Sequence, residues 1–429
     1  MSVPAGMFVC HGCGTLVDAA SCLPFRCPSA GVGDADHLLV PLADDPNCLV
    51  TGGDNPYLRY RSFLSPYRLA RRVGLSDAAW GDIVGELDEA LVATDGKGFL
   101  VTPMAEHPAL AAGASFPGRL WVKNETGNVA GSHKARHLMG VMLYLRVLEL
   151  AKLQVGEGLR ERRLAIASCG NAALAATVIA RAADWPIDVF IPPDASQSVV
   201  RRLGELGARV TVCERRQGED GDPCFLRFRE AVGAGAIPFG VQGSENGLAV
   251  EGGRTLALEM AEFFAVSNTP IDRVYVQVGG GALASGLAQG FALAVKCGWL
   301  RRMPQIVAVQ TTACAPLARA WERMAGIDVA QACARRSQFM WAWENVQASL
   351  AGGILDDETY DWLEIVQGMR NSGGFPVIVD EAMLAKAHDL GNRLAGIRVS
   401  ATGTAGFAGM LATPPEGGHA AVIFSGVER

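Results

Sequence analysis

The chain has 429 residues, of which 49% are hydrophobic and 19% charged, so it can bury a large core and is too apolar for a disordered protein. Its formal net charge of -6, with Lys and Arg dispersed along the chain, argues against nucleic acid or an anionic membrane as the main partner. No apolar run reaches the roughly 18 residues of a membrane span, no signal-peptide pattern is present, and the 11 scattered cysteines predict reduced thiols and a cytoplasmic location.

Residues 1–60 are predicted to form a cysteine-bearing, loop-rich extension, and helical patterns follow at 67–73 and 80–92. From about residue 119, short apolar runs alternate with amphipathic windows, which predicts α/β architecture with parallel sheets flanked by helices. Strands are expected at 120–123, 164–167, 187–191, 209–212, 274–278, 306–309, 377–379 and 421–424. Helices are expected at 134–148, 172–183, 198–206, 252–263 and 284–295. Because ligands bind beyond the carboxyl ends of parallel strands, the residues after these strands are the candidate site.

The stretch from Lys123 to Arg136 leads from a strand through a glycine-bearing turn into a helix that starts near Lys134. A lysine at this point lies at the positive end of the helix dipole and is partly desolvated, and both effects lower its pKa. A lysine with a lowered pKa can act as a Schiff-base nucleophile. The alternative for this stretch alone is an ordinary solvated lysine on a helix face.

A second strand is followed by four small or polar residues that open a helix. Backbone N–H groups at such a point can approach a substrate carboxylate or the edge of a planar ring, and an asparagine side chain can bind a phenolic oxygen. The alternative is a plain helix cap. The residues are Ser168, Cys169, Gly170 and Asn171.

A third strand runs into three consecutive glycines and then a helix, which is the pattern of a phosphate cradle built from backbone N–H groups. The spacing is neither that of a dinucleotide fingerprint nor that of a P-loop. A purely structural turn is the alternative. The residues are Gly279, Gly280, Gly281 and Ala282.

A fourth strand, at 421–424, ends at Ser425 and Gly426, and taken alone it is a plain edge strand running into a frayed terminus.

In this order, the four stretches resemble the fold-type II family of pyridoxal-5′-phosphate (PLP) enzymes, most closely its threonine synthase and threonine dehydratase branch. The family pattern Lys-x-Glu-x-x-Asn-x-x-Gly-Ser-aromatic-Lys-x-Arg is matched at Lys123, Glu125, Asn128, Gly131, Ser132, His133, Lys134 and Arg136. Further matches are Thr102-Pro103, Gly204 to Val210, Glu251 to Thr255 and Val309-Gln310. The resemblance covers residues 55–429 and implies a two-lobed tryptophan-synthase-β-like fold. The smaller lobe is expected at about 135–250, and the larger at about 61–134 plus 251–429.

The resemblance also implies a role for each stretch. Lys134 is expected to carry PLP as a Schiff base and to remove the Cα proton, while the glycine loop with Ala282 holds the phosphate. Asn171 is expected to bind the phenolic oxygen, and the Ser168–Asn171 loop the substrate carboxylate. His133 stands where most relatives have phenylalanine, and tryptophan synthase β has a histidine there that helps to bind the phosphate.

Ser425 is expected to face the pyridine nitrogen of the cofactor. A neutral hydroxyl does not keep that nitrogen protonated as an aspartate would, so transamination is disfavoured. We therefore expect α,β-elimination from a β-substituted amino acid by a dehydratase or ammonia-lyase that forms a homodimer. A threonine synthase-like replacement reaction is the alternative, and Ala135, where threonine synthases usually have aspartate, leaves the substrate open. A PLP-binding protein without turnover is the third hypothesis.

The extension looks like the zinc-ribbon-like start of bacterial threonine synthases, with Cys10, Cys13 and Cys27 in the positions of zinc ligands. In the ribbon pattern the fourth ligand falls at Ala30, and Cys22 is the candidate substitute. With no cysteine at the fourth position, a degenerate, metal-free ribbon is favoured over a zinc site.

Overall fold

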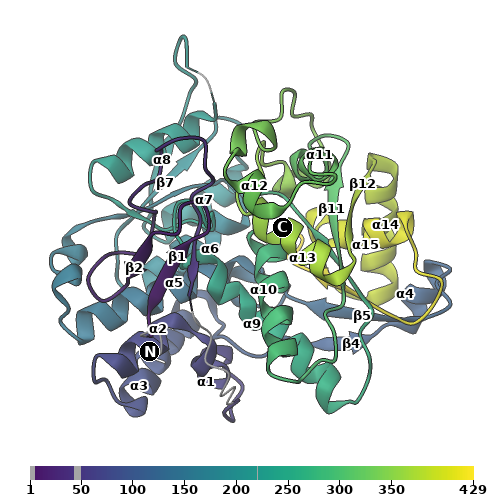
Figure 1. Cartoon of the computed structure of the whole chain (residues 1–429), viewed down its shortest axis with the longest axis horizontal. Helices are drawn as coiled ribbons and strands as arrows, with labels where there is room; N and C mark the ends of the chain where they lie inside the picture. Colours follow the sequence, from purple (N-terminus) through teal and green to yellow (C-terminus); the bar gives the residue numbers. More distant parts are fainter. Residues whose placement is uncertain (1–4, 43–49, 220) are drawn as a thin grey trace.

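The computed structural model describes residues 5–42, 50–219 and 221–429, which form a small N-terminal module beside two larger α/β units (Figure 1). The strands are β1 (Met7–Cys10), β2 (Leu16–Asp18), β3 (Leu39–Pro41), β4 (Met104–Glu106), β5 (Arg119–Asn124), β6 (Leu164–Ala167), β7 (Ile187–Ile191), β8 (Arg209–Val212), β9 (Ile237–Pro238), β10 (Arg273–Gln277), β11 (Gln305–Thr311), β12 (Phe375–Val379) and β13 (His419–Phe424).

The helices in the first part of the chain are α1 (Pro56–Arg59), α2 (Ser65–Arg72), α3 (Asp77–Asp95), α4 (Pro108–Gly113), α5 (Lys134–Leu150), α6 (Asn171–Ala182), α7 (Gln197–Glu205), α8 (Pro223–Gly233), α9 (Ala249–Val266) and α10 (Ala282–Lys296). Those that follow are α11 (Pro316–Arg323), α12 (Val329–Cys333), α13 (Trp362–Ser372), α14 (Glu381–Ala395) and α15 (Ala401–Ala412). Within the described ranges, no helix combines the length and the apolar character that a bilayer span requires.

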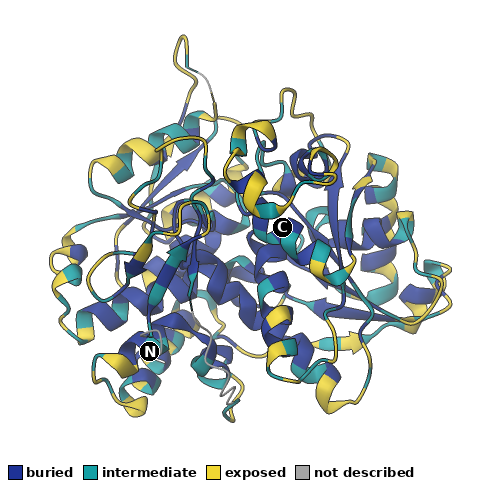
Figure 2. Cartoon of the chain, viewed as in Figure 1, coloured by how far each residue is buried: buried dark blue, intermediate teal, exposed yellow. Residues whose placement is uncertain are grey.

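Two of the three sheets are the parallel sheets predicted from the sequence. One has six strands in the order β12-β11-β10-β13-β5-β4, all parallel except β4 at its edge. The other has four parallel strands in the order β8-β7-β6-β9. Both are covered by helices, and most of their strands are buried (Figure 2). All eight expected strands are present, whereas the lobe boundaries stay a prediction.

The C-terminal strand β13 lies inside the six-stranded sheet, between β10 and β5. Its residues Ala420 to Phe424 are fully buried, as expected for a central strand with helices on both faces. The interpretation of this segment as a plain edge strand is therefore wrong. The chain's end lies between the two α/β units, where the C label stands in Figure 1.

The N-terminal extension is more ordered than its loop-rich composition indicated. It contains a three-stranded antiparallel sheet in the order β2-β1-β3. Among the described residues nine cysteines are free, but Cys297 is disulfide-bonded, so the expectation of wholly reduced thiols is wrong at that residue.

Close helix packing in the centre of the molecule depends on glycines of the matched Glu251–Thr255 segment. A Cβ atom at Gly252, in α9, would lie 2.1 Å from the backbone oxygen of Arg136 in α5. A Cβ atom at Gly253 would lie 2.2 Å from the imidazole of His137. These positions exclude any side chain, so α9 can pack directly against the first turn of α5, which begins at Lys134.

Candidate active site

Lys134 is the first residue of α5, and the segment before it is attached to the end of β13. The backbone N–H of His133 donates to the Ser425 oxygen at 3.1 Å, and Ser132 forms an antiparallel bridge with Gly426. The central position of β13 thus fixes the start of α5. Burial lowers the pKa of the Lys134 amine, and the nearby carboxylates of Asp356 and Asp361 oppose this shift only in part. A lowered pKa is what the predicted role of Lys134 as a Schiff-base nucleophile requires, and that role stays a prediction.

A buried network of four charges lies beneath this turn. The Arg136 guanidinium donates to both oxygens of Glu125, at 2.8 and 2.9 Å, and to both of Glu259, at 2.6 and 3.0 Å. Lys123 Nζ donates to Glu259, and Asn128 Nδ2 donates to Glu125 at 2.8 Å. The two positive and two negative charges balance, which is the condition for burying charges. The sequence motif around Lys134 therefore includes the residues that support its helix.

Burial by itself would raise the pKa of the Glu125 carboxyl. The charge and hydrogen bonds of Arg136 outweigh this effect and lower the pKa of Glu125 to about 2. Glu125 is therefore ionised at neutral pH although its side chain is fully buried. The network is held together by full charges rather than by neutral hydrogen bonds, which is why each partner depends on the others.

The glycine loop has the backbone of an anion cradle at the start of α10. Gly281 caps this helix with a φ of 105°, a conformation that favours glycine. The Gly280 N–H donates to Asp356 Oδ2 at 2.8 Å. A carboxylate thus accepts a hydrogen bond where the phosphate was expected, which shows that this loop presents a donor to an anion. The residues fit a phosphate group, whose charge the start of α10 favours.

Asp356 itself was not identified from the sequence. Burial raises the pKa of its carboxyl, with Lys134 and the Gly280 N–H acting in the opposite direction. A Cβ atom at Gly279 would lie 2.3 Å from Asp356 Oδ2, so the aspartate contacts the loop along its first two glycines. Asp361 also contacts the loop, since its backbone N–H donates to the Gly280 oxygen at 3.1 Å.

The Ser168–Asn171 loop lies at the end of β6 and the start of α6, and its four residues are half-buried. Ser168 Oγ accepts from the Gly170 N–H at 3.4 Å. Asn171 Oδ1 accepts from Arg429 Nε at 3.1 Å, which leaves Nδ2 as the group of this amide that can donate to a ligand oxygen. A donor is what binding to a phenolate oxygen requires. Arg429 is a second residue that the sequence did not identify.

Ser425 follows β13, and its hydroxyl is bound by Gln277 at the end of the neighbouring strand β10. Gln277 Nε2 donates one N–H to Ser425 Oγ at 2.5 Å and shares the other between the backbone oxygens of Gly403 and Ile423, at 3.1 and 3.2 Å. The two backbone oxygens can only accept hydrogen bonds. The amide nitrogen of Gln277, and not its oxygen, therefore faces them and Ser425. Since the serine oxygen accepts from Gln277, its own proton is available for another acceptor.

His133 and His137 are buried and lie 5.8 Å apart between ring centroids. Burial lowers the pKa of both rings, and for His137 it reaches about 3. His133 Nδ1 lies 3.1 Å from the backbone oxygen of Ser425, so this nitrogen carries the proton and Nε2 is an acceptor in the neutral ring. A phosphate oxygen needs a hydrogen-bond donor, and Nε2 of the neutral ring is an acceptor. The phosphate-binding role of His133 stays a prediction.

Three of the four cysteines predicted as metal ligands lie together. Cys10, Cys13 and Cys27 form a cluster with His37, and their ligand atoms are all within 4.8 Å of one another. Cys22 is exposed, outside this cluster, with its Sγ 3.9 Å from the Leu23 oxygen. The fourth member of the cluster is therefore His37 and not Cys22. His37 lies in the loop before β3, which returns to the cluster, whereas Cys22 lies in the turn after β2, which does not.

Comparison with protein families finds one match over most of the chain. The family model described as "Pyridoxal-phosphate dependent enzyme" matches residues 97–426. Among curated proteins, "Serine dehydratase-like" of Rattus norvegicus and of Homo sapiens are 32% and 31% identical to the chain over 212 residues. The matches cover 49% of this chain and 56% of each relative, so the chain spans about half the length of the curated relatives that it matches.

Solved structures share the fold at low sequence identity. A threonine deaminase from T.th. has a TM-score of 0.60 and 21% identity, covering 81% of this chain and 98% of its own. Maize serine racemase has a TM-score of 0.59 and 18% identity, covering 81% and 93%. The L-serine ammonia-lyase of Rhizomucor miehei has a TM-score of 0.57 and 17% identity, covering 77% and 94%.

Proposed function

Because the chain belongs to the pyridoxal-phosphate-dependent enzyme family and PLP is its cofactor, we propose that it catalyses α,β-elimination from a β-substituted amino acid. The products are a keto acid, ammonia and the β leaving group. When bound, the cofactor supplies an electron sink for the pair left at Cα after proton removal. The lyase and racemase names among the similar proteins agree with chemistry that begins by removing a Cα proton.

The chain's own residues divide this work. The Lys134 amine, whose pKa is lowered by burial, holds the cofactor and then accepts the Cα proton. The Gly279–Ala282 backbone holds the phosphate at the start of α10. The Ser168–Asn171 loop takes the substrate carboxylate at the start of α6, and Asn171 Nδ2 donates to the phenolic oxygen.

The observation that carries elimination is the hydrogen bond from Gln277 Nε2 to Ser425 Oγ. Because Gln277 occupies the serine oxygen as an acceptor, the Ser425 hydroxyl would donate a hydrogen bond to the pyridine nitrogen of bound PLP, and that nitrogen would stay unprotonated. A ring kept neutral in this way would be a weak electron sink, which would favour expulsion of the β leaving group. Transamination would need a stronger electron sink than this pair of residues provides.

Replacement of a β or γ leaving group, as in threonine synthase, begins with the same removal of the Cα proton. The Ser425–Gln277 arrangement serves both outcomes, and which one follows depends on whether water or another nucleophile meets the product of elimination. A panel of β- and γ-substituted amino acids, assayed for keto acid and ammonia and for replacement products, with and without added thiol or amine nucleophiles, separates the two. Homodimer assembly and a cytoplasmic location are further parts of the proposal.

The decisive variant is Ser425→Asp, with Ser425→Ala as its matched control. An aspartate beside the ring nitrogen would raise the pKa of that nitrogen and keep it protonated. We expect keto-acid release to slow, with more of the amino group left on the cofactor, whereas Ser425→Ala loses one neutral hydrogen bond worth about 1 kcal/mol. Equal rates and product ratios in the wild type and Ser425→Asp, with PLP bound, contradict the proposal. Chiral analysis of the remaining substrate tests racemisation in the same reactions.

A further inference from the structure

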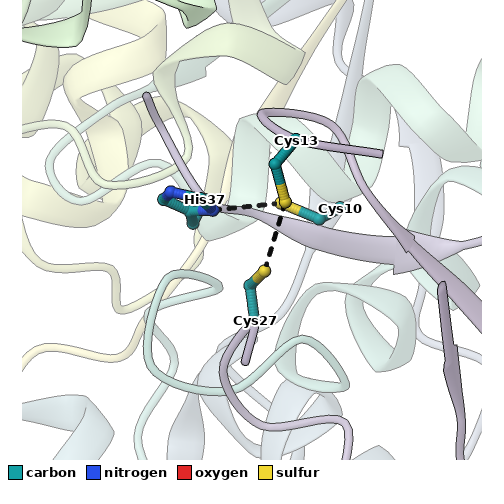
Figure 3. Close-up of side chains that lie close together, drawn as sticks. All are labelled: Cys10, Cys13, Cys27 and His37. Atoms are coloured by element: carbon teal, nitrogen blue, oxygen red, sulfur yellow. Dashed lines mark hydrogen bonds between the residues drawn. The ribbon is translucent and has the colours of Figure 1, made fainter. Parts of the chain in front are cut away.

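The N-terminal module brings four potential metal ligands to one point. Cys10 ends β1, Cys13 lies in the turn that follows, Cys27 belongs to the loop after β2, and His37 precedes β3. Figure 3 shows the three thiols and the imidazole turned toward one another. Cys10 and Cys27 are buried, His37 is half-buried, and Cys13 is exposed.

The spacing of these atoms is that of a tetrahedral metal site. Cys10 Sγ lies 3.5 Å from His37 Nδ1, and Cys13 Sγ lies 3.6 Å from Cys27 Sγ. Zinc binds sulfur at about 2.3 Å and histidine nitrogen at about 2.0 Å, so the edges of its coordination tetrahedron are about 3.5–3.8 Å long. The two measured distances agree with such edges before any ion draws the ligands together.

A disulfide between Cys13 and Cys27 is the simplest competing explanation. The two sulfurs, however, are 3.6 Å apart and both cysteines are free, whereas a disulfide bond has a length of about 2.0 Å. A disulfide would also leave unexplained why Cys10 and His37 face the same point. A metal ion accounts for all four residues.

The surroundings of the cluster orient its members as ligands. His37 Nε2 lies 3.3 Å from the backbone oxygen of Val32, so it carries the ring proton and leaves the Nδ1 lone pair facing the thiols. The backbone N–H of Ser29 donates to Cys27 Sγ at 3.4 Å, a contact that stabilises a thiolate. Supporting hydrogen bonds of this kind are a regular feature of metal sites.

We propose that Cys10, Cys13, Cys27 and His37 bind one Zn²⁺ in a closed structural site. Four protein ligands leave no open position, so the ion has no part in the chemistry at Lys134. The module has strands of only four, three and three residues, which is too little structure to be stable alone. A metal ion that joins its two loops to β1 compensates for this small size.

The site also explains how the module connects the two larger units. On one side, Phe8 and Leu39 pack in the same hydrophobic core as residues of α5 and α6. On the other, Asp36, next to His37, accepts from Trp362 Nε1 at 2.8 Å, and His11 pairs with Glu364. Trp362 and Glu364 belong to α13, which begins beside the glycine loop. Zinc thus stabilises a contact that spans both units.

The test is metal analysis of the full-length protein purified without chelators. We expect about one zinc per chain in the wild type. Cys13→Ser and His37→Ala should each lose it, because each removes a ligand that lies toward the surface, where the change itself disturbs little packing. Cys22→Ser is the matched control, since this cysteine lies in the same module, is exposed and is outside the cluster. It should keep the zinc.

Thermal unfolding and cobalt substitution complete the test. Loss of zinc should lower the unfolding temperature of Cys13→Ser and His37→Ala but not that of Cys22→Ser. Wild-type protein loaded with Co²⁺ should show the intense visible bands of a tetrahedral ion with thiolate ligands, a result independent of any variant's folding. Zinc-free wild-type protein, zinc that survives in both ligand variants, loss of zinc from Cys22→Ser, or an octahedral cobalt spectrum would each overturn the proposal.

Discussion

Replacing Arg136 by methionine should strongly destabilise the protein, although Arg136 is not itself a reacting group. Its guanidinium donates to both oxygens of Glu125 and of Glu259, and all three side chains are buried. Methionine has a similar length and fills most of the volume. The two carboxylates would then face only Lys123, so one negative charge would be buried without a partner. Breaking a buried ion pair in this way costs about 3–5 kcal/mol, and since two carboxylates are affected the upper end is expected.

The pH dependence of the free energy of unfolding shows whether the unpaired carboxylate causes the destabilisation. In the wild type the folded-state pKa of Glu125, about 2, is below its unfolded value, so its contribution to stability is present above that unfolded value and is lost as the pH falls toward 2. In Arg136→Met the lowering charge is gone and burial raises the pKa of the same carboxyl. Acid then neutralises the unpaired group in the folded protein. The difference in the free energy of unfolding between the wild type and Arg136→Met should therefore become smaller as the pH is lowered.

The assay is urea unfolding at pH 7.5 and pH 5, with Arg393→Met as the matched control. Arg393 pairs with Asp389 on the exposed face of α14, where such a pair contributes about 0.5 kcal/mol or less. The urea midpoint of Arg136→Met should fall far below that of the control at pH 7.5 and recover part of the difference at pH 5. Equal midpoints for the two variants, or a deficit that does not change with pH, would refute the reasoning.

Lys134→Ala should abolish reducible attachment of PLP and all turnover, and PLP fixed by borohydride to another lysine would exclude the assignment. The folded pKa of His137, about 3, lies below its unfolded value, so stability should be full above about pH 6.5 and fall as acid approaches pH 3. His137→Asn should show a smaller loss of urea midpoint between pH 7 and pH 5, and an identical loss would contradict this. Asp356→Asn removes a negative charge that accepts from Gly280, so PLP should bind the apoprotein about tenfold more tightly. Unchanged or weaker affinity in an absorbance titration would show that Asp356 does not compete with the phosphate.

The fold was predictable where elements are long and apolar. The eight expected strands and the helices near them stand out by periodicity, and the tryptophan-synthase-β-like fold is confirmed by the family match and the shared structures. Strand β9, with two residues, and the edge strand β4, with three, are too short to show a period. The segment between β11 and β12 combines short helices with long irregular stretches, so its course could not be derived from local pattern.

The candidate site was predictable to the extent that its residues are neighbours in the sequence. Motif residues such as Lys134 and the glycines are recognisable by their spacing. Gln277, Asp356, Arg429 and His37 are not, because each is a single polar residue whose partner lies far away in the chain. Gln277 offered one signal, since it is a polar residue within the apolar run 274–278 that leads into the glycine loop. A buried polar side chain at that point needs a partner, and the parallel neighbour of β10 supplies Ser425.

The position of Lys134 in the chain fold follows from three contacts of the first turn of α5, none of which involves the lysine side chain. His133 fixes the turn to β13 through Ser425, Arg136 fixes it to the charge network, and the Arg136 backbone lies against Gly252 of α9. Together these contacts join the turn to β13, to Glu125 after β5 and to α9, so the turn cannot shift along one of these elements without breaking a contact to another. This explains why the family pattern extends beyond the lysine on both sides. The same residues that make the motif recognisable in the sequence hold the start of α5, and with it Lys134, in place.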